Sequence, residues 1–376
     1  MDIGIATFAA HRIRTGIGTY IVNLVSALLS VDCENRYLLF ASDENASLFP
    51  QNGGKVRKLT ASRSVNHTAL RLIWEHTILP MRLHQHKVDV FHGPTFVTPL
   101  FSPCPTVVTI ADMTWFTHSE HHILAKRRYF QTLIPLVARK AHHIIAMTDN
   151  TKKDIVRILH LPEDKVTTVY CGVDSSFHPV TDPLQLAEVK RRYHIDGDFI
   201  LFVGIIEPRK NLVRLVDAFC DLKRQGVPHT LVLAGPHGWG YAEVAAHIRE
   251  RQLDKHVHFT GPVAQEDLPV LFSAADLFVY PSLYEGFGLP PLEAMACGVP
   301  VVTSNVSALP EVVGDAGVLV DPLSVEDLRA AMWKVLSSND LHQQLRARGF
   351  AQARRFTWEN TARRTLQVYQ NAYGSV

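Results

Sequence analysis

Short runs of apolar, mostly β-branched residues recur along the chain, and segments with helical spacing lie between most of them. An apolar run without polar alternation is typical of a strand buried on both faces, and intervening helices of roughly 10 to 15 residues are typical of βαβ units. The pattern therefore predicts an α/β protein with parallel sheets and a Rossmann-like architecture. The runs are residues 88–92, 106–110, 142–147, 199–204, 229–235, 256–261, 276–282 and 299–304.

Two domains of this kind fit the length of the chain. Its 376 residues exceed what one hydrophobic core comfortably supports. Segment 175–198 carries two prolines and a charged helix between two strand-helix series, so we interpret it as the linker. We expect one Rossmann-like domain at 1–180, a second at 181–356 and a last helix at 357–376. That helix needs a packing partner for its apolar residues, Leu366, Val368, Tyr369 and Tyr373.

The composition indicates a folded soluble enzyme. Hydrophobic residues make up 47% and charged residues 20% of the chain, and the net charge of +2 does not suggest a nucleic-acid partner. The first 180 residues are mildly basic, with 19 Lys and Arg against 14 Asp and Glu. The five cysteines are scattered without a CxxC pair, which argues against a disulfide framework or a structural zinc site.

The expected location is the cytoplasm. The N-terminus lacks the basic start and long apolar run of a signal peptide, and no segment has the apolar length of a membrane span. Segment 125–143, AKRRYFQTLIPLVARKAHH, interleaves basic and apolar residues, so it is either an ordinary surface helix or one that rests on anionic lipid. Weak peripheral contact with the inner face of the membrane is therefore a prediction.

Two glycine-containing turns follow predicted strands. In RTGIGTY, residues 14–20, Gly16 lies before a helix, where backbone N–H groups and the helix dipole favour an anion such as phosphate. A plain tight turn is the alternative, because the dinucleotide fingerprint lacks its third glycine. In GIIEPRKN, Arg209 and Lys210 precede a second helix, where they could neutralise a diphosphate or simply be solvated.

The stretch YEGFGLPPLEAMACG, residues 284–298, carries two glutamates eight positions apart. Glu285 is expected on the loop after a strand, and Glu293 one turn into a helix that opens on a double proline. Gly286 and Gly288 allow close approach of the backbone, so that their N–H groups and that of Phe287 can bind oxygens. Each carboxylate can accept two hydrogen bonds from vicinal hydroxyls. Pairing with surface Lys or Arg is the alternative.

Taken together, these motifs resemble a retaining GT-B glycosyltransferase of glycosyltransferase family 4. The resemblance is dense from about residue 199 onward and covers nearly the whole chain. It implies two Rossmann-like domains with parallel sheets facing across a cleft. The motifs are E-x7-E at 285–293, EPRKN at 207–211, FTGPVAQEDLP at 259–269, GVPVVTSNVSALPEVVGDAGVLVDP at 298–322, TGIGTY at 15–20, TIADMTWFTHSE at 109–120 and KVTTVYCGVDSSFHPV at 165–180.

The resemblance also implies roles for single residues. Glu293 would bind the ribose of the nucleotide, and Glu285, with the amides of Gly286, Phe287 and Gly288, would hold hydroxyls of the donor sugar. Two cations, Arg209 and Lys210, would stabilise the departing diphosphate. From the first domain, Gly16 would contact phosphate. The last helix would pack back on the first domain, and transfer would proceed without a metal.

One position departs from the family pattern. In TIADMTW the family commonly has a histidine before the aspartate, where this chain has Ala111. Asp112 remains a candidate polar residue of the active-site floor, and His118 is either a substitute for the missing histidine or an ordinary one. The D-x-D of Asp196 and Asp198 resembles a metal motif but reads better as a turn before a strand. HSEHH, residues 118–122, lacks the spacing of a zinc helix.

The function expected from the sequence is transfer of a hexose from a nucleotide sugar to a lipid-linked or saccharide acceptor. The motif sequences are most similar to those of mannosyl- and rhamnosyltransferases of bacterial polysaccharide or O-antigen assembly, so GDP-mannose is the first donor to consider. A nucleotide-sugar epimerase on the same fold is an alternative, as is a binding protein without transfer activity. No cofactor is expected. The acceptor and its linkage have no signature in the sequence.

Overall fold

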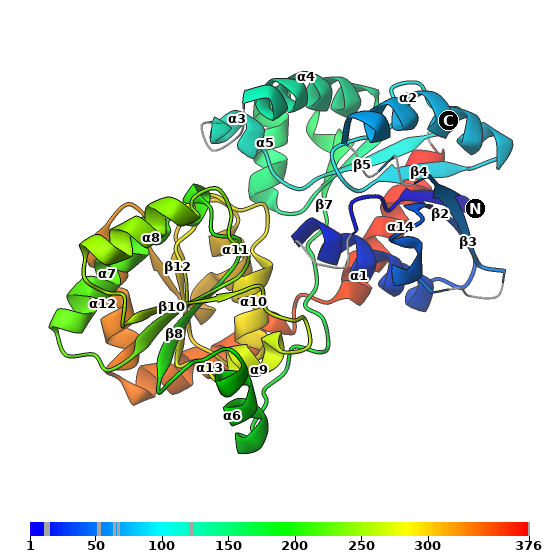
Figure 1. The fold of residues 1–376 in the computed structure, drawn as a ribbon. Helices are drawn as coiled ribbons and strands as arrows, with labels where there is room; N and C mark the ends of the chain where they lie inside the picture. Colours follow the sequence, from blue (N-terminus) through cyan, green and yellow to red (C-terminus); the bar gives the residue numbers. More distant parts are fainter. Residues whose placement is uncertain (11–15, 51–53, 63–64, 66–67, 120–123, 375–376) are drawn as a thin grey trace. The chain divides into compact units, whose positions relative to one another are not determined.

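A computed structural model describes the chain except for residues 11–15, 51–53, 63–64, 66–67, 120–123 and 375–376. The chain divides into two compact units (Figure 1). Unit 1 comprises Met1–Gly172 and Thr357–Val376, and unit 2 comprises Val173–Phe356. The first boundary lies eight residues before the expected one, because Phe177 packs on Phe272 and Val180 N–H donates to Ser273 Oγ within unit 2.

Unit 1 is built around a parallel sheet. Its described part has the strand order β3-β2-β1-β4-β5-β6-β7. The strands are β1 (Asp2–Ala6), β2 (Arg36–Ser42), β3 (Val56–Ala61), β4 (Val90–Gly93), β5 (Thr106–Ile110), β6 (His143–Ala146) and β7 (Val166–Thr168). The helices are α1 (Gly16–Val31), α2 (Thr68–Gln85), α3 (Thr114–Thr117), α4 (Leu124–Lys140), α5 (Asp149–Leu159) and α14 (Trp358–Gly374). Helices α2 and α4 lie on one face of the sheet, and α1 and α14 lie on the other (Figure 1).

The last helix belongs to unit 1. Helix α14 packs against α1 and against strands β4, β5 and β6. The Tyr369 hydroxyl lies 2.7 Å from Nδ1 of His92 on β4, and His92 Nε2 lies 2.8 Å from Thr109 Oγ1 on β5. Val368 and Tyr369 are buried as predicted, whereas Tyr373 is exposed because Ala372 takes the inward position in the last turn.

Unit 2 has a second parallel sheet, of order β10-β9-β8-β11-β12-β13 in its described part. The strands are β8 (Phe199–Val203), β9 (Thr230–Ala234), β10 (Val257–Gly261), β11 (Leu277–Tyr280), β12 (Val301–Ser304) and β13 (Val318–Val320). The helices are α6 (Pro183–Arg192), α7 (Leu212–Arg224), α8 (Tyr241–Glu250), α9 (Leu268–Ser273), α10 (Leu289–Ala296), α11 (Leu309–Val313), α12 (Val325–Leu336) and α13 (Asn339–Ala353).

The strand order of unit 2 creates a topological switch point. The chain proceeds from β8 toward one edge of the sheet through β9 and β10, and then returns to β11 on the other side of β8. In such sheets ligands bind outside the carboxyl ends of the two strands at the switch. The segments after β8 and β11 are therefore where a ligand site is expected in this unit.

The predicted fold class is confirmed, since both units are doubly wound parallel sheets of Rossmann type. The expected strand at 106–110 has the observed bounds, and the other predicted runs overlap strands that are one to three residues shorter. The interpretation of 175–198 as a linker is wrong, because α6 packs on α9 as part of unit 2. In the described part of the chain, none of the helices has both the length and the apolar character needed to cross a membrane.

Candidate functional site

The loop after β8 places two cations at the switch point. It runs from Gly204 into a short 3-10 helix, Pro208–Lys210, and then into α7. Asn211 turns the chain with a left-handed φ of 60° and donates from Nδ2 to Pro322 O at 2.6 Å, which fixes the turn. Lys210 is thereby buried. A buried ammonium requires a partner of opposite charge.

Glu285, on the loop after β11, is that partner. Lys210 Nζ lies 2.6 Å from Glu285 Oε1, and Arg209 Nη1 lies 2.9 Å from Glu285 Oε2. Arg209 Nη2 also pairs with Glu207 Oε1 at 2.6 Å. Three residues that the sequence nominated separately, Arg209, Lys210 and Glu285, are thus brought into direct contact. With Glu207 they form a group of two cations and two carboxylates, which we call the ion cluster.

The ion cluster keeps its charges although it is buried. Burial by itself would raise the pKa of Glu285, but Arg209 and Lys210 outweigh burial and lower this pKa to about 2. Burial lowers the pKa of Lys210, and Arg209 acts in the same direction, whereas Glu285 opposes both. Because a short charge-assisted contact joins Lys210 to Glu285, both groups are ionised at neutral pH.

Several residues that contact the ion cluster were not predicted from the sequence. The Tyr280 hydroxyl, at the end of β11, accepts from Lys210 Nζ at 2.6 Å. Glu285 N–H donates to Ser307 Oγ at 3.0 Å, and Arg209 Nη1 donates to Tyr284 O at 2.5 Å. Ser307 holds a left-handed φ of 56°. That strained position is the kind found at functional sites, but it leaves no signal in the sequence.

The turn after Glu285 leads directly into α10. Gly288 has a φ of 103°, which favours glycine, and a Cβ built there would lie 2.9 Å from Leu309 Cδ2, so that this side chain would have to shift. The Phe287 side chain is buried against Phe356, with ring centroids 5.8 Å apart. Its ring serves the core, so Phe287 can reach a ligand only through its backbone, as the sequence led us to expect.

Glu293 lies one turn into α10 and is buried. Burial raises its pKa to about 8, and the nearby Asp174 acts in the same direction. Within the described part of the chain, its carboxyl group has no ion pair. The Glu293 carboxyl is therefore mainly protonated at neutral pH in the ligand-free protein. Hydroxyl groups of a ligand would give it the hydrogen-bond partners that a buried carboxylate needs.

The remaining predicted site residues lie in unit 1. Gly16 is the first residue of α1, and a Cβ built on it would meet no atom within 4 Å, so packing does not require glycine there. Asp112 Oδ1 accepts from the Thr114 N–H at 2.9 Å and from its hydroxyl at 2.6 Å, so this carboxylate holds the start of α3. His118, at the end of α3, contacts Thr117 Oγ1 through Nδ1 at 3.1 Å.

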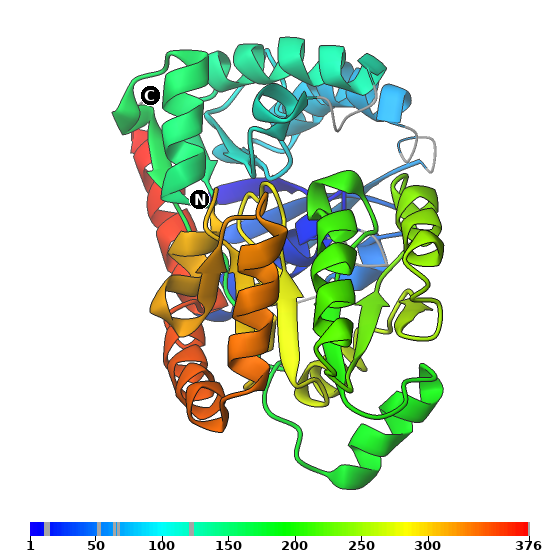
Figure 2. The same ribbon diagram turned by 90° about the vertical axis from the view of Figure 1, so that its left-hand side faces the viewer.

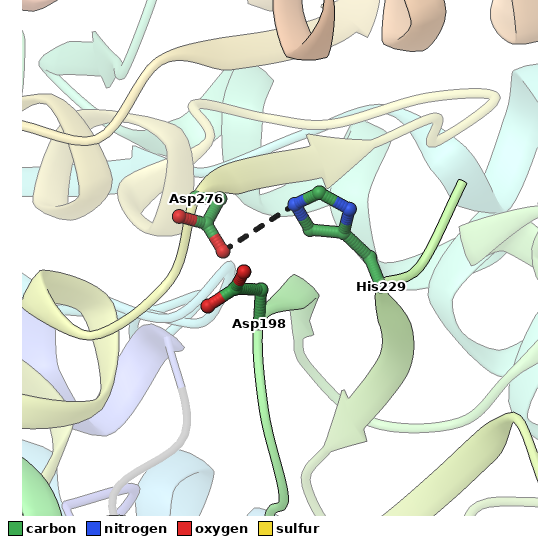
Figure 3. A group of neighbouring side chains, drawn as sticks. All are labelled: Asp198, His229 and Asp276. Atoms are coloured by element: carbon green, nitrogen blue, oxygen red, sulfur yellow. Dashed lines mark ion pairs between the residues drawn. The ribbon is translucent and has the colours of Figure 1, made fainter.

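In unit 2, one group of side chains of the types that bind metal ions lies at the amino ends of the strands, opposite the ion cluster. Asp198, His229 and Asp276 each immediately precede a strand, and one ligand atom from each lies within 4.8 Å of the others (Figure 3). His229 Nε2 is 3.5 Å from Asp276 Oδ2, and the Phe199 N–H donates to the same oxygen. Because this group is at the amino ends of the strands, it is remote from the ion cluster. Within HSEHH, residues 120–122 lie outside the described residues.

Comparison with known proteins gives the family. Residues 14–177 match the family model described as Glycosyltransferase Family 4, and residues 188–352 match Glycosyl transferases group 1. The chain belongs to the GT-B glycosyltransferases that carry these two domains. It is 34% identical to the O-antigen chain mannosyltransferase B of Escherichia coli over 96% of this chain and 98% of that protein.

Solved structures agree with this fold. A sucrose-phosphate synthase from Thermosynechococcus elongatus matches with a TM-score of 0.80 and 20% identity, covering 100% of both chains. WaaG, a glycosyltransferase involved in lipopolysaccharide biosynthesis, matches with a TM-score of 0.75 and 16% identity, covering 98% of this chain and 99% of that one. At such identities the likeness concerns the fold alone. The expectation that the chain is a GT-B glycosyltransferase is confirmed by the family models and by the relative from Escherichia coli.

Proposed function

We propose that the protein is a retaining, metal-independent hexosyltransferase that moves mannose from GDP-mannose to a lipid-linked or saccharide acceptor in cell-surface polysaccharide synthesis. The observation that carries the proposal is the ion cluster at the switch point of unit 2, where Arg209 and Lys210 meet Glu285. The similarity to an O-antigen chain mannosyltransferase supports the choice of sugar and pathway. The proposed location is the cytoplasm, with peripheral contact at the inner face of the membrane.

In this proposal Arg209 and Lys210 stabilise the nucleoside diphosphate as it leaves. Placed donors that meet developing charge are the largest single term in many enzymes. Arg209 and Lys210 can fill the role that a divalent cation has in other transferases, because they bring two positive charges to the same place. In the ligand-free protein Glu285 forms ion pairs with both cations. When the donor binds, the Glu285 oxygens would give up part of this pairing and accept hydrogen bonds from hydroxyls of the donor sugar.

The way Glu285 is held argues against a double displacement through this carboxylate. A retaining hydrolase uses a carboxylate as nucleophile, with one oxygen available to attack the anomeric carbon. Both oxygens of Glu285 are engaged, one by Lys210 and the other by Arg209. We therefore propose that Glu285 positions the donor sugar. The departing phosphate would guide the acceptor hydroxyl to the same face of the sugar that the phosphate leaves.

The ribose of the donor is assigned to α10, and the donor sugar to the turn before it. The amides of Gly286, Phe287 and Gly288 would bind hydroxyls of the donor sugar, and Glu293 would accept hydrogen bonds from both ribose hydroxyls. A buried carboxyl group whose pKa is about 8 gains hydrogen-bond partners when a diol arrives, so binding favours the ionised form. Gly16 keeps its proposed contact with phosphate, Asp112 its proposed place in the active-site floor, and His118 its proposed role as substitute for the histidine that the family has at position 111.

A thermal-shift panel tests the donor assignment first. GDP, UDP, ADP and TDP, with their common sugars, are added to the wild type, to Glu293→Ala and to the matched control Glu250→Ala, whose side chain is 78% exposed on α8. We expect one nucleotide family, that of GDP, to stabilise the wild type and the control but not Glu293→Ala. Equal stabilisation of all three proteins would contradict the ribose role.

Product analysis then separates transfer from the alternatives. Incubation with labelled GDP-mannose and an acceptor glycan extract should release GDP and label the glycan. Epimerised nucleotide sugar without GDP release would identify an epimerase. Stabilisation by GDP-mannose with neither product would identify a binding protein.

A further inference from the structure

Helix α2 presents apolar side chains on its outer stripe. Leu70, Ile73 and Met81 are 47%, 60% and 62% exposed, while Leu79 and Leu83 on the inner side are fully buried. A surface helix of a globular protein normally buries one apolar stripe and covers the opposite side with polar residues. On α2 the exposed side carries these apolar side chains beside polar ones such as Thr77 and Arg82, so the outer stripe requires an explanation beyond folding.

Helix α4 repeats the arrangement with basic residues added. Leu124 and Leu136 are exposed on its outer stripe, and Lys126, Arg128 and Lys140 are exposed beside them. The Lys140 ammonium lies 5.7 Å from the ring centroid of Phe101, which is 79% exposed. Of the eight exposed large apolar side chains described in unit 1, seven lie on α2, on α4 or at Phe101.

The two stripes form one surface. Leu72 of α2 and Tyr129 and Phe130 of α4 pack against the same hydrophobic core. Burial raises the pKa of the Tyr129 hydroxyl on α4, and Glu75 of α2 acts in the same direction. Both views show α2 and α4 next to each other over the same face of the sheet (Figure 1 and Figure 2). We call the exposed side chains of α2 and α4, together with Phe101, the outer surface of unit 1.

The charge on this surface has a single sign. The two helices hold seven Lys and Arg, namely Arg71, Arg82, Lys126, Arg127, Arg128, Arg139 and Lys140. Their one acidic residue is Glu75, which is buried. A surface of basic and aliphatic residues without exposed acids matches anionic headgroups over an acyl layer. A second copy of the same surface would bring like charges together.

We propose that the outer surface of unit 1 docks on an anionic lipid bilayer, with Ile73, Met81 and Phe101 entering the interface and Lys126, Arg128 and Lys140 contacting headgroup phosphates. This inference locates the membrane contact included in the proposed function. Neither helix spans the bilayer, since each carries too much charge or too little apolar length. The helices lie in the plane of the interface, and unit 1 is held where lipid-linked acceptors are present.

Co-sedimentation with vesicles tests the docking. Phosphatidylcholine vesicles with and without about a third of phosphatidylglycerol are mixed with the wild type, with Ile73→Gln/Met81→Gln and with Lys126→Gln/Arg128→Gln/Lys140→Gln. We expect salt-sensitive binding of the wild type to the anionic vesicles alone. The basic triple variant should bind roughly 100-fold more weakly, and the apolar double variant roughly tenfold.

Matched controls come from unit 2. Leu184→Gln removes a side chain that is 81% exposed on α6, and Arg191→Gln/Lys255→Gln/Lys334→Gln removes three exposed basic residues. Both should bind like the wild type. Equal losses in the controls, equal binding to neutral vesicles, or self-association that the apolar double variant abolishes would each overturn the docking surface. Nucleotide stabilisation, measured in the same variants without lipid, reports separately on the donor site.

Discussion

Buried titratable groups are treated differently in the two units. In unit 2, Glu285, Lys210 and Arg209 are kept ionised by pairing with one another, and the pKa of Glu285 falls to about 2. In unit 1, burial without a close ion pair shifts two groups toward their neutral forms: it lowers the pKa of His92 to about 3 and raises that of Glu75 to about 7. Paired charges can be redirected to a charged ligand, whereas neutral groups hold the fold.

Glu293 makes this comparison sharper. It belongs to unit 2 but follows the behaviour of unit 1, since burial raises its pKa to about 8. A carboxyl group that is neutral without ligand and ionised with ligand couples binding to the release of a proton. The cluster and Glu293 should therefore respond differently to mutation and to pH.

The largest effect is expected at Lys210. Lys210→Ala removes a donor to the leaving diphosphate and leaves Glu285 with less compensation, so kcat/KM should fall about 1000-fold. The double variant Lys210→Met/Glu285→Gln removes both charges of the pair and should recover the stability that the single variant loses. Steady-state kinetics and urea unfolding of both variants make the distinction. A single variant of near wild-type activity would contradict the role of Lys210.

The next effect is the pH dependence of nucleotide binding. Because the ligand is expected to bind the ionised form of Glu293, affinity for GDP should rise about tenfold per unit between pH 6 and pH 8 and level off above it. Glu293→Gln cannot ionise and should show only the dependence that comes from the nucleotide itself. Calorimetric titration at four pH values measures both. If the affinity of the wild type and that of Glu293→Gln changed with pH in the same way, Glu293 would not lose a proton on binding.

In unit 1, Glu75 should make stability depend on pH. Burial raises its folded pKa to about 7, above the ordinary value of 4.5 for a glutamate in the unfolded chain, so its stabilising effect is complete below pH 4.5 and is lost as the pH rises to about 7. Glu75→Gln keeps the neutral form at every pH. We expect the variant to be more stable than the wild type by on the order of 3 kcal/mol at pH 8, with little difference at pH 4.5. Urea unfolding at both pH values decides this.

The smallest effect is expected at Tyr369. Tyr369→Phe removes the hydroxyl that lies 2.7 Å from His92 Nδ1 and should cost about 1 kcal/mol in the free energy of unfolding. Activity should change little, because the bond anchors α14 to β4 and touches no proposed ligand. Loss of nucleotide binding in this variant would show that the neutral network of unit 1 has more than a structural role.

The sequence predicts most of the strands that are buried on both faces, although β2, RYLLFAS, was missed despite being buried almost throughout. Strand β5 reads as TVVTI and was placed at its observed bounds. Strand β3 was missed because it is an edge strand, VRKLTA, whose half-exposed side chains break the apolar run. Strand β13 is only three residues long, too short for a pattern. The boundary at 172 was missed because the contacts of Phe177 are with residues far along the chain.

The candidate site was predictable in its charged residues but not in their supports. Arg209, Lys210 and Glu285 follow strands whose carboxyl ends meet in a parallel sheet, so the sequence indicates one site for them but not the ion pairs between them. The contact of Lys210 with the Tyr280 hydroxyl depends on how a tyrosine at a strand end is oriented. The contact of the Glu285 amide with Ser307 depends on a left-handed backbone position. Neither has a local signature.

The return of the chain to unit 1 has a consequence for biosynthesis. Residues 173–356 are contiguous and can fold as soon as they leave the ribosome, because domains generally fold as units during synthesis. Unit 1 starts first but receives α14 only after all of unit 2 has been made. Until then the surfaces of α1, β4 and β5 that α14 covers, including His92, are open to water and to chaperones. Vectorial synthesis therefore completes the second unit before the first.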